Sequence, residues 1–406
     1  MNILALNAGS STLKFKVLRF PEKREKVRGL CERIGLEGSC VSYIIEGNQR
    51  SYNAVLENHN DALHAVLKVL TEGAAEGFYS SEEIAVIGHR IAHGGDRFVE
   101  PTVIDDTVLE ELEVCKELAP LHNEAALKVI KACREMFENV PMVAVFDTSF
   151  HQTMPQKAYM YAVPYELYET YKVRRYGFHG TSHKYAAYKA AEALGIPLED
   201  SKIIVCHLGN GASITAVQNG KSVDTSMGFT PLEGLVMGTR SGDIDPSVVG
   251  FLAGKTELSQ EEILRKLNTE SGLKGISKKS SDFREVLEAM NTGDSNATLA
   301  IEMFVYRIRK YIGSYIAVMD GVDVLVFTGG IGEKSSYVRE AVCEGFSFAG
   351  IEIDKVRNRT VAGDGEISTD ESKVKVMVVC TDEELMIAQE TYEVMYKGDE
   401  VCTTNS

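Results

Sequence analysis

Short apolar runs recur along the chain and predict β-strands, and longer stretches between several of them have the apolar spacing of helices. The strand-like runs lie at 3–6, 13–18, 84–88, 142–146, 203–207, 213–217, 324–327 and 374–379. Helical spacing is seen over 107–118, 123–137 and 296–319, and the last of these carries charges that exclude a membrane span. Strands and helices mixed in this way predict an α/β chain.

Two local signals mark helix ends. Ser259 and Glu262 form an S-x-x-E capping box ahead of an apolar run. Thr181 or Ser182 is expected to cap a helix that stops at Gly195.

The stretch 3–17, I-L-A-L-N-A-G-S-S-T-L-K-F-K-V, predicts a strand, a turn of small polar residues and a second strand. In the second strand Leu13, Phe15 and Val17 share one face, and the two lysines share the other. The glycine allows close backbone approach, the hydroxyls can donate hydrogen bonds and Lys14 supplies a charge, so the turn has the parts of a phosphate site. The stretch 203–217, I-I-V-C-H-L-G-N-G-A-S-I-T-A-V, repeats this pattern. The repeat suggests a duplicated architecture that binds one polyphosphate.

The length of 406 residues suffices for two domains. We expect a boundary near residue 150, after V-A-V-F-D-T-S, which gives domains over 1–150 and 151–384. The C-terminal segment, about 385–406, is expected to pack back on the first domain. Its helix is expected to run from Glu384 to Met395.

The formal net charge of −16 argues against nucleic acid or an anionic membrane as partner. An anionic substrate must then be attracted by a local positive site. We find no apolar run long enough to span a membrane and no secretory signal, and the eight cysteines form no C-x-x-C pair. These features predict reduced thiols and a cytoplasmic protein.

Two common nucleotide motifs are missing. The chain has no Walker A loop, and the segment T-G-G-I-G-E at 328–333 does not fit the Rossmann fingerprint. That segment nevertheless follows a strand and precedes a stretch that can be helical, so it could hold the phosphates or ribose of a nucleotide. A tight turn without a ligand is the alternative.

Arginine and histidine gather beside glycine in three places, where glycine leaves space for a substrate and arginine binds carboxylate or phosphate. The three clusters are G-H-R-I-A-H-G-G-D-R-F, R-R-Y-G-F-H-G-T-S-H and M-G-T-R-S-G-D-I-D-P. His179 and His183 have the i, i+4 spacing of zinc ligands, but the residues between them predict a turn into a helix and no H-E-x-x-H pattern is present.

Carboxylates follow two strand ends. Asp147 in F-D-T-S ends one strand and T-D-E-E at 381–384 ends another. Open α/β sheets place ligands at this edge, and carboxylates suit Mg²⁺. The alternative for T-D-E-E is an acidic helix start favoured by the helix dipole.

The chain resembles the acetate kinase family, which belongs to the sugar kinase, Hsp70 and actin superfamily. Eight motifs occur in the family's order between residue 3 and about 390: N-A-G-S-S-T-L-K, H-R-I-A-H-G-G, F-D-T-S-F-H-Q-T-M-P, Y-G-F-H-G-T-S-H, H-L-G-N-G-A-S, M-G-T-R-S-G-D-I-D-P, F-T-G-G-I-G-E and T-D-E-E. The resemblance implies two ribonuclease H-like domains with a nucleotide in the cleft between them. It also implies a homodimer that uses ATP with Mg²⁺, or Mn²⁺ in its place, to convert acetate to acetyl phosphate reversibly.

The resemblance further implies roles for individual residues. Arg90 and Arg240 correspond to the substrate and transition-state arginines, His179 to the transition-state stabiliser and Asp147 to the active-site acid. The implied substrate contacts are Arg90, Ala92, His122 and Phe178, and the implied magnesium site is Asn7 and Glu383. The implied nucleotide contacts are Lys14, His207, Leu208, Gly209, Asn210, Gly211, Asp282, Phe283, Arg284, Gly330, Ile331, Gly332, Glu333 and Lys334.

The residue types can be compared with the chemistry. A carboxylate substrate is ionised at neutral pH, so its attack on a phosphate needs no general base. We therefore expect Asp147 to orient an arginine or a metal-bound water and not to transfer a proton.

Ala92 stands where many acetate kinases carry valine, and the smaller side chain leaves room for about one more carbon. We expect appreciable propionate activity, with acetate still preferred. A propionate kinase is the nearest alternative. A non-catalytic actin-like protein would not need Arg90, Arg240 and His179 together.

Overall fold

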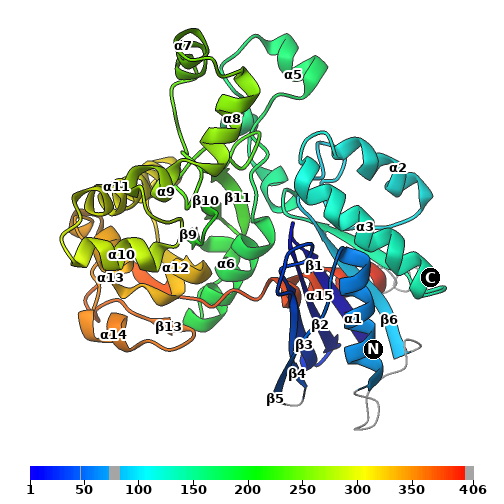
Figure 1. The fold of residues 1–406 in the computed structure, drawn as a ribbon. Coiled ribbons are helices and arrows are strands. Elements are labelled where there is room, and N and C mark those ends of the chain that lie inside the picture. The colour runs from blue at the N-terminus through cyan, green and yellow to red at the C-terminus, as the bar shows by residue number, and fades with distance from the viewer. Residues whose placement is uncertain (46, 73–82, 398–406) are drawn as a thin grey trace. The chain divides into compact units, whose positions relative to one another are not determined.

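The computed structural model describes residues 1–45, 47–72 and 83–397, with the side chains of 120–122 and 397 excepted. The chain divides into two compact units, Met1–Phe150 with Asp382–Ser406, and His151–Thr381 (Figure 1). We propose that these units are the two domains predicted from the sequence.

The first unit is built on an eight-stranded sheet of order β5-β4-β3-β2-β1-β6-β8-β7. Its strands are β1 (Asn2–Ala8), β2 (Thr12–Arg19), β3 (Arg24–Glu32), β4 (Cys40–Ile45), β5 (Asn48–Asn53), β6 (Ile84–Ile91), β7 (Thr102–Val103) and β8 (Met142–Phe146). Its helices are α1 (His59–Glu72), α2 (Asp106–Cys115), α3 (Pro120–Met136) and α15 (Glu383–Tyr392). β1, β6 and β8 are parallel neighbours, so their carboxyl ends lie at one edge.

The predicted first hairpin is confirmed. β1 and β2 pair antiparallel from Asn2–Arg19 to Ala8–Leu13. The Gly9 amide donates to the Thr12 carbonyl at 2.9 Å, and the Gly9 carbonyl lies 2.8 Å from Nε2 of His59. The turn is therefore tied both to itself and to α1.

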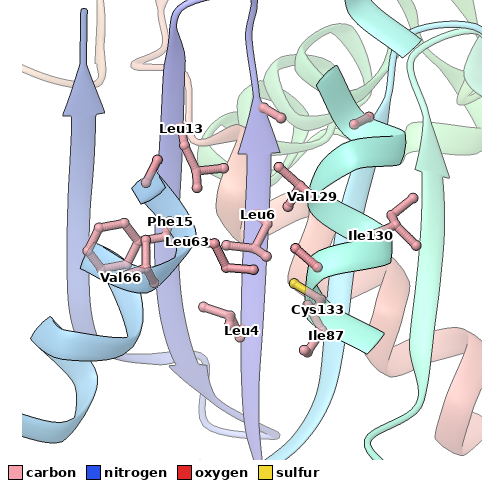
Figure 2. Packing of buried hydrophobic residues seen from close by; sticks show 14 of the residues in the cluster. Leu4, Leu6, Leu13, Phe15, Leu63, Val66, Ile87, Val129, Ile130 and Cys133 are labelled. Carbon is pink, nitrogen blue, oxygen red and sulfur yellow. The ribbon is translucent and has the colours of Figure 1, made fainter. Parts of the chain in front are cut away.

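Both faces of this sheet are covered. Leu6, Leu13 and Phe15 pack with residues of α1 and α3, such as Leu63 and Ile130 (Figure 2). On the opposite face, Ile387 and Ala388 of α15 pack with residues of β1, β6 and β8, including Ile3, Val86 and Val143. The terminal helix thus completes the core of the first unit.

The second unit is built on a six-stranded sheet of order β11-β10-β9-β12-β14-β13. Its strands are β9 (Lys202–Leu208), β10 (Ala212–Gln218), β11 (Lys221–Thr225), β12 (Val324–Thr328), β13 (Gly365–Glu366) and β14 (Lys375–Val378). Its helices are α4 (Gln156–Tyr159), α5 (Tyr165–Tyr171), α6 (Gly180–Leu194), α7 (Ser247–Lys255), α8 (Gln260–Thr269), α9 (Gly272–Ser277), α10 (Phe283–Asn291), α11 (Ser295–Met319), α12 (Gly329–Lys334), α13 (Ser336–Cys343) and α14 (Lys355–Thr360).

The two sheets share one topology. β3-β2-β1-β6-β8-β7 of the first sheet matches β11-β10-β9-β12-β14-β13 of the second, strand for strand. In both, the first hairpin is antiparallel, the next two neighbours are parallel and the last strand is antiparallel. The repeated hairpins predicted from the sequence therefore begin two equivalent sheets, and β4 and β5 are additions to the first.

Most of the predicted helix signals are confirmed. Ser259 and Glu262 form the reciprocal capping box of α8, and Gly195 ends α6 in the left-handed conformation. The expected cap of α6 at Thr181 or Ser182 is wrong, because the helix begins at Gly180 with His179 as N-cap residue. The Ser182 hydroxyl instead lies 2.8 Å from Nδ1 of His207.

The seven cysteines of the described residues are free thiols, and five of them are buried. Among the described helices, none combines the length and the apolar character that crossing a membrane requires.

Candidate active site

Arg90 and Asp147 form a buried ion pair at the carboxyl edge of the first sheet. Arg90 is near the end of β6, and Asp147 follows the last residue of the adjacent parallel strand β8. Nε and Nη2 of Arg90 donate to the two oxygens of Asp147 at 2.9 and 2.5 Å. A bidentate pair of this kind fixes both the position and the plane of the guanidinium.

Asn7 of β1 connects this pair to the start of α15. Its Oδ1 accepts from Nη1 of Arg90 at 2.9 Å. Its Nδ2 donates to Glu383 at 2.8 Å and to Glu384 at 3.0 Å. Residues separated by more than 370 positions thus form one hydrogen-bonded group.

The start of α15 is held by a buried lysine. Lys16 is 5% exposed, and its Nζ lies 2.8 Å from both oxygens of Asp382. Asp382 is the N-cap residue of α15 and also accepts from the Leu385 amide at 2.9 Å. The expected acidic helix start is therefore real, and it places the next two glutamates beside Asn7.

The charges around Arg90 are unbalanced. Burial alone would lower the pKa of Arg90, but the carboxylates of Asp147, Glu383 and Glu384 raise it above its usual value. Three carboxylates therefore surround one guanidinium, which leaves net negative charge for a cation to neutralise.

The donor set at Glu383 and Glu384 fits Mg²⁺. Adjacent carboxylate oxygens at a strand edge are the ligands that this ion prefers, with water and substrate phosphate completing its shell. In the described residues, no three His, Cys, Asp or Glu side chains alone converge on a metal position. The side-chain oxygen of Asn7 accepts from Arg90 and its nitrogen donates to both glutamates, so the Asn7 oxygen is not directed at them. Its place in the magnesium site stays a prediction.

The second unit contains a cavity of about 660 Å³ at the carboxyl edge of its sheet. Eight of the predicted nucleotide contacts line it, namely Gly209, Asn210, Asp282, Phe283, Arg284, Gly330, Ile331 and Lys334. The β9–β10 turn, the start of α10 and helix α12, which begins directly after β12, supply these residues. The glycines of the β9–β10 turn and of α12 leave space at two strand ends, and the nucleotide there stays a prediction.

The other predicted nucleotide contacts of the second unit do not line the cavity. Leu208 is buried in the core, and the Glu333 carboxylate accepts from the amides of Gly329 and Thr381 at 3.1 and 3.0 Å. The Gly332 carbonyl accepts from the buried Arg339 guanidinium at 2.8 Å. His207 bonds to Ser182. Lys14 is an exposed residue of β2 in the first unit.

His179 and Arg240 lie side by side at the β9–β10 turn. A Cβ atom on Gly211 would lie 3.4 Å from Nη1 of Arg240, and 3.6 and 3.7 Å from Cε1 and Nε2 of His179. Gly211, predicted to contact the nucleotide, therefore leaves open a small space bordered by two donors.

Burial lowers the pKa of Arg240, and no carboxylate contributes to the shift. Its Nη1 makes only long contacts, 3.4 Å to the Pro231 carbonyl and 3.6 Å to the Met237 sulfur. The Arg240 side chain is half-buried and has no ion pair in the part of the chain that the structure describes, so pairing with an incoming anion would stabilise it.

The loop that carries Arg240 packs tightly on α9. Gly272 has a φ of +61°, and a Cβ atom there would lie 2.1 Å from the Met237 carbonyl and 2.6 Å from the Arg240 carbonyl. Only glycine fits this contact without strain.

The remaining predicted substrate residues are distributed over both units. Ala92 is 9% exposed and follows β6 directly, and Phe178 is buried in the core of the second unit. His122 belongs to α3, and its side chain lies outside the described residues.

Sequence reasoning missed several cavity residues, which are Gly238, Ser281, Leu287, Ser335, Ser336 and Tyr337. Gly238 stands within the predicted M-G-T-R cluster, and the serines flank predicted contacts. Glu384 was missed as a partner of Asn7, although T-D-E-E contains it.

The two matched sheets, with a glycine-lined cavity at one and a carboxylate–arginine group at the other, define a two-domain α/β phosphotransferase. Residues 2–389 match the model of the acetokinase family, and the chain belongs to that family. An acetate kinase of Alkaliphilus metalliredigens is 51% identical over 96% of this chain and 99% of its own length.

Solved structures also resemble this chain in both sequence and fold. The Porphyromonas gingivalis acetate kinase is 45% identical with a TM-score of 0.90, over 97% of this chain and 99% of its own. A propionate kinase of Francisella tularensis is 43% identical with a TM-score of 0.89, and the match covers 96% of this chain and 98% of the propionate kinase. The predicted family and the predicted actin-like two-domain fold are thus confirmed, while the interdomain nucleotide cleft stays a prediction.

Proposed function

We propose that this protein transfers a phosphoryl group reversibly from ATP to acetate, giving ADP and acetyl phosphate. Family membership supports the reaction class. The observation that carries the proposal is the half-buried guanidinium of Arg240, which has no carboxylate partner among the described residues and lies beside His179. Such a pair of donors suits the charge that spreads over a phosphoryl group in transfer.

Acetate attacks as an ionised carboxylate, so the obstacle is repulsion between two anions. Arg90 binds the substrate carboxylate or acyl phosphate, and Arg240 and His179 stabilise the transferring group. Asp147 holds Arg90 in place through its bidentate pair. It therefore acts as a positioning residue, and removing one donor from such a set typically lowers kcat by about 10²–10³-fold.

The nucleotide is proposed to occupy the cavity of the second unit, whose lining includes Phe283, Ile331 and Lys334. Mg²⁺, or Mn²⁺, is proposed at Glu383 and Glu384, where it would neutralise phosphate charge when bound. Asn7 and Lys16 keep the two glutamates in place.

Propionate is the second candidate substrate, and Ala92 favours it. One methylene in an apolar pocket discriminates by only ~1–3 kcal/mol, so a small residue at this position leaves propionate usable. The solved propionate kinase with a similar fold accords with this breadth.

A homodimer and a cytoplasmic location are proposed on the family resemblance, and the net charge of −16 supports the absence of nucleic acid and anionic membrane as partners.

Trapping the acyl phosphate with hydroxylamine tests the function. Acetate, propionate and butyrate are compared at several concentrations with ATP and Mg²⁺. We expect hydroxamate from acetate and propionate, with kcat/KM for propionate less than about a thousandfold lower. No product from any acid would favour a non-catalytic actin-like protein instead.

A further inference from the structure

The hydroxyl of Ser213 on β10 bridges two histidines of the second unit. Ser213 Oγ lies 2.9 Å from Nδ1 of His179 and 2.7 Å from Nε2 of His183. The two histidines are one helical turn apart, His179 as N-cap residue of α6 and His183 in its first turn. Ser213 and His183 are both fully buried, so no bulk water competes for these bonds.

Counting protons limits the arrangement to two forms. A hydroxyl has one proton and two lone pairs. Among the described residues Ser213 Oγ bonds only to the two ring nitrogens, so accepting from both would leave its own proton buried without an acceptor. Ser213 therefore donates to one ring nitrogen and accepts from the other. In the first form His183 donates from Nε2, and Ser213 donates to Nδ1 of His179. In the second form His179 donates from Nδ1, and Ser213 donates to Nε2 of His183.

The surroundings of His183 distinguish these forms. Its Nδ1 is buried with no hydrogen-bond partner among the described residues. Burial, with His151 and His207 nearby, lowers the pKa of His183 well below its usual value, so the ring is neutral. The second form would place the ring's only proton on the unpartnered Nδ1, and a buried N–H without a partner costs roughly 1–3 kcal/mol. The first form leaves there only a lone pair, which is tolerated better.

We propose that Ser213 and His183 are positioning residues that fix neutral His179 as the tautomer with its proton on Nε2. Nε2 and Cε1 form the edge of the His179 ring that borders the space above Gly211, beside Nη1 of Arg240. His179 therefore presents an N–H donor to an incoming anion at neutral pH without having to become an imidazolium. The inference rests on the proposed phosphoryl-transfer role of His179.

The groups around His179 are compatible with this tautomer. The His207 ring stands 4.4 Å from the His179 ring, and its Nδ1 is engaged by Ser182. His151 is occupied by Ser222 and the Phe178 carbonyl, and burial lowers its pKa to about 4. Arg240 is the cation beside Nε2, and it disfavours a second positive charge on the imidazole.

Long-range ¹H–¹⁵N NMR on the full-length protein with ¹⁵N-labelled histidine tests the proposal directly. At pH 7.5 we expect the His179 signals of a protonated Nε2 and an unprotonated Nδ1, with His183 likewise protonated on Nε2. A His179 ring protonated on Nδ1, or an equal mixture, would overturn the proposal. The tautomer is measured on the wild-type protein. The variants His179→Gln and His183→Gln serve only to assign the signals.

Variants add a kinetic readout. Ser213→Ala should lower kcat about tenfold, less than loss of a complete donor, and should make kcat rise toward lower pH as His179 becomes protonated. Thr215→Val is the matched control, because it removes a buried hydroxyl two residues along β10 that bonds to Thr225 instead of a histidine. The control should keep the wild-type pH profile and tautomer.

His183→Gln retains a donor toward Ser213, whereas His183→Met does not. We expect the glutamine variant to keep the tautomer of His179 and most of kcat, and the methionine variant to behave like Ser213→Ala. If both His183 variants lost the same amount of kcat and kept the wild-type pH profile, the role of His183 would be merely structural. Full activity of His179→Ala would instead contradict the proposed function.

Discussion

Asp147 accepts two parallel hydrogen bonds from Arg90 and is 2% exposed. Both carboxylate oxygens are thus engaged by the guanidinium. A group so engaged is suited to hold the arginine in one orientation and poorly suited to take up a proton during catalysis.

Replacing Asp147 with asparagine should show whether Asp147 orients Arg90 or transfers a proton. The amide keeps one acceptor for Arg90 but loses the second, so we expect kcat/KM for acetate to fall by about 10²-fold with little change in KM for ATP. The shape of the pH–rate profile should not change. Steady-state rates between pH 5.5 and 9 provide the measurement, and Asp106→Asn, at an exposed pair with Arg134, is the control. Loss of an acidic limb at nearly full activity would show instead that Asp147 transfers a proton.

Ala92→Val tests the size of the acyl pocket. The larger side chain should exclude the extra methylene of propionate, so the ratio of kcat/KM for acetate to that for propionate should increase about tenfold. Hydroxamate assays with both acids measure this ratio. An unchanged ratio would place the pocket away from Ala92.

Gly272→Ala should inactivate the protein through the Arg240 loop. The new methyl group meets two backbone carbonyls at 2.1 and 2.6 Å and has an unfavourable positive φ, so the loop must move. We expect kcat to fall at least about 10²-fold, as for loss of one transition-state donor. Gly250→Ala is the control, since it lies in α7 with nothing within 4 Å of its Cβ position. Near-normal kcat in Gly272→Ala would show that the loop tolerates displacement.

The ion pair between the buried Lys16 and the half-buried Asp382 should stabilise the first unit. Lys16→Met leaves Asp382 without its cation, which is expected to lower the free energy of unfolding by about 2–4 kcal/mol and to raise the Mg²⁺ concentration needed for half-maximal rate. Urea unfolding and Mg²⁺ titrations measure the two effects. Lys23→Met, which removes only an exposed bond to Gln389 of α15, should have little effect. If Lys16→Met and Lys23→Met had the same unfolding free energy and the same Mg²⁺ dependence, the pair between Lys16 and Asp382 would not stabilise the first unit.

His89 should make stability depend on pH. Burial lowers the pKa of His89 to about 3, and its Nε2 is buried without a hydrogen-bond partner among the described residues. Because the unfolded chain binds this proton near pH 6.5 and the folded one does not, stability should fall as the pH drops from about 6.5 toward 3.

His89→Leu should remove this contribution. The unfolding free energy of the variant should fall less steeply below pH 6.5, by up to about 1.4 kcal/mol per pH unit. Urea unfolding at pH 7.5, 6.0 and 5.0 measures the slope, and His64→Leu, at an exposed position of α1, is the control. Parallel slopes for wild type and His89→Leu would show that His89 is protonated in the folded protein.

Local patterns in the sequence were sufficient for part of this structure. The glycine and serine turn after an apolar run predicted the hairpin at Gly9, and strand ends predicted the sheet edge that carries Asp147. Strand β3 was missed because charged residues interrupt its apolar positions, and β5 because its residues are polar and almost all exposed. Strand β4 has no charged residue, and its apolar pattern was overlooked.

Contacts over long sequence distances could not be predicted. Lys16 was placed on the lysine face of its strand, yet it is buried because α15, more than 360 residues later, covers that face. Likewise, the bridge from His179 to His183 through Ser213 depends on how α6, which packs on β9 and β12, lies against the second sheet. Neither contact leaves a periodic signal in the sequence.

The chain path of the first unit has a consequence for biosynthesis. Its sheet is translated first, but α15, which covers one face of that sheet and carries Glu383 and Glu384, is translated only after the whole second unit. The continuous segment His151–Thr381 can therefore fold on the ribosome before the first unit is complete, which reverses the usual N-to-C order. Until the last helix emerges, Ile3, Val86 and Val143 present an uncovered apolar face on the nascent chain, which is a binding surface for chaperones.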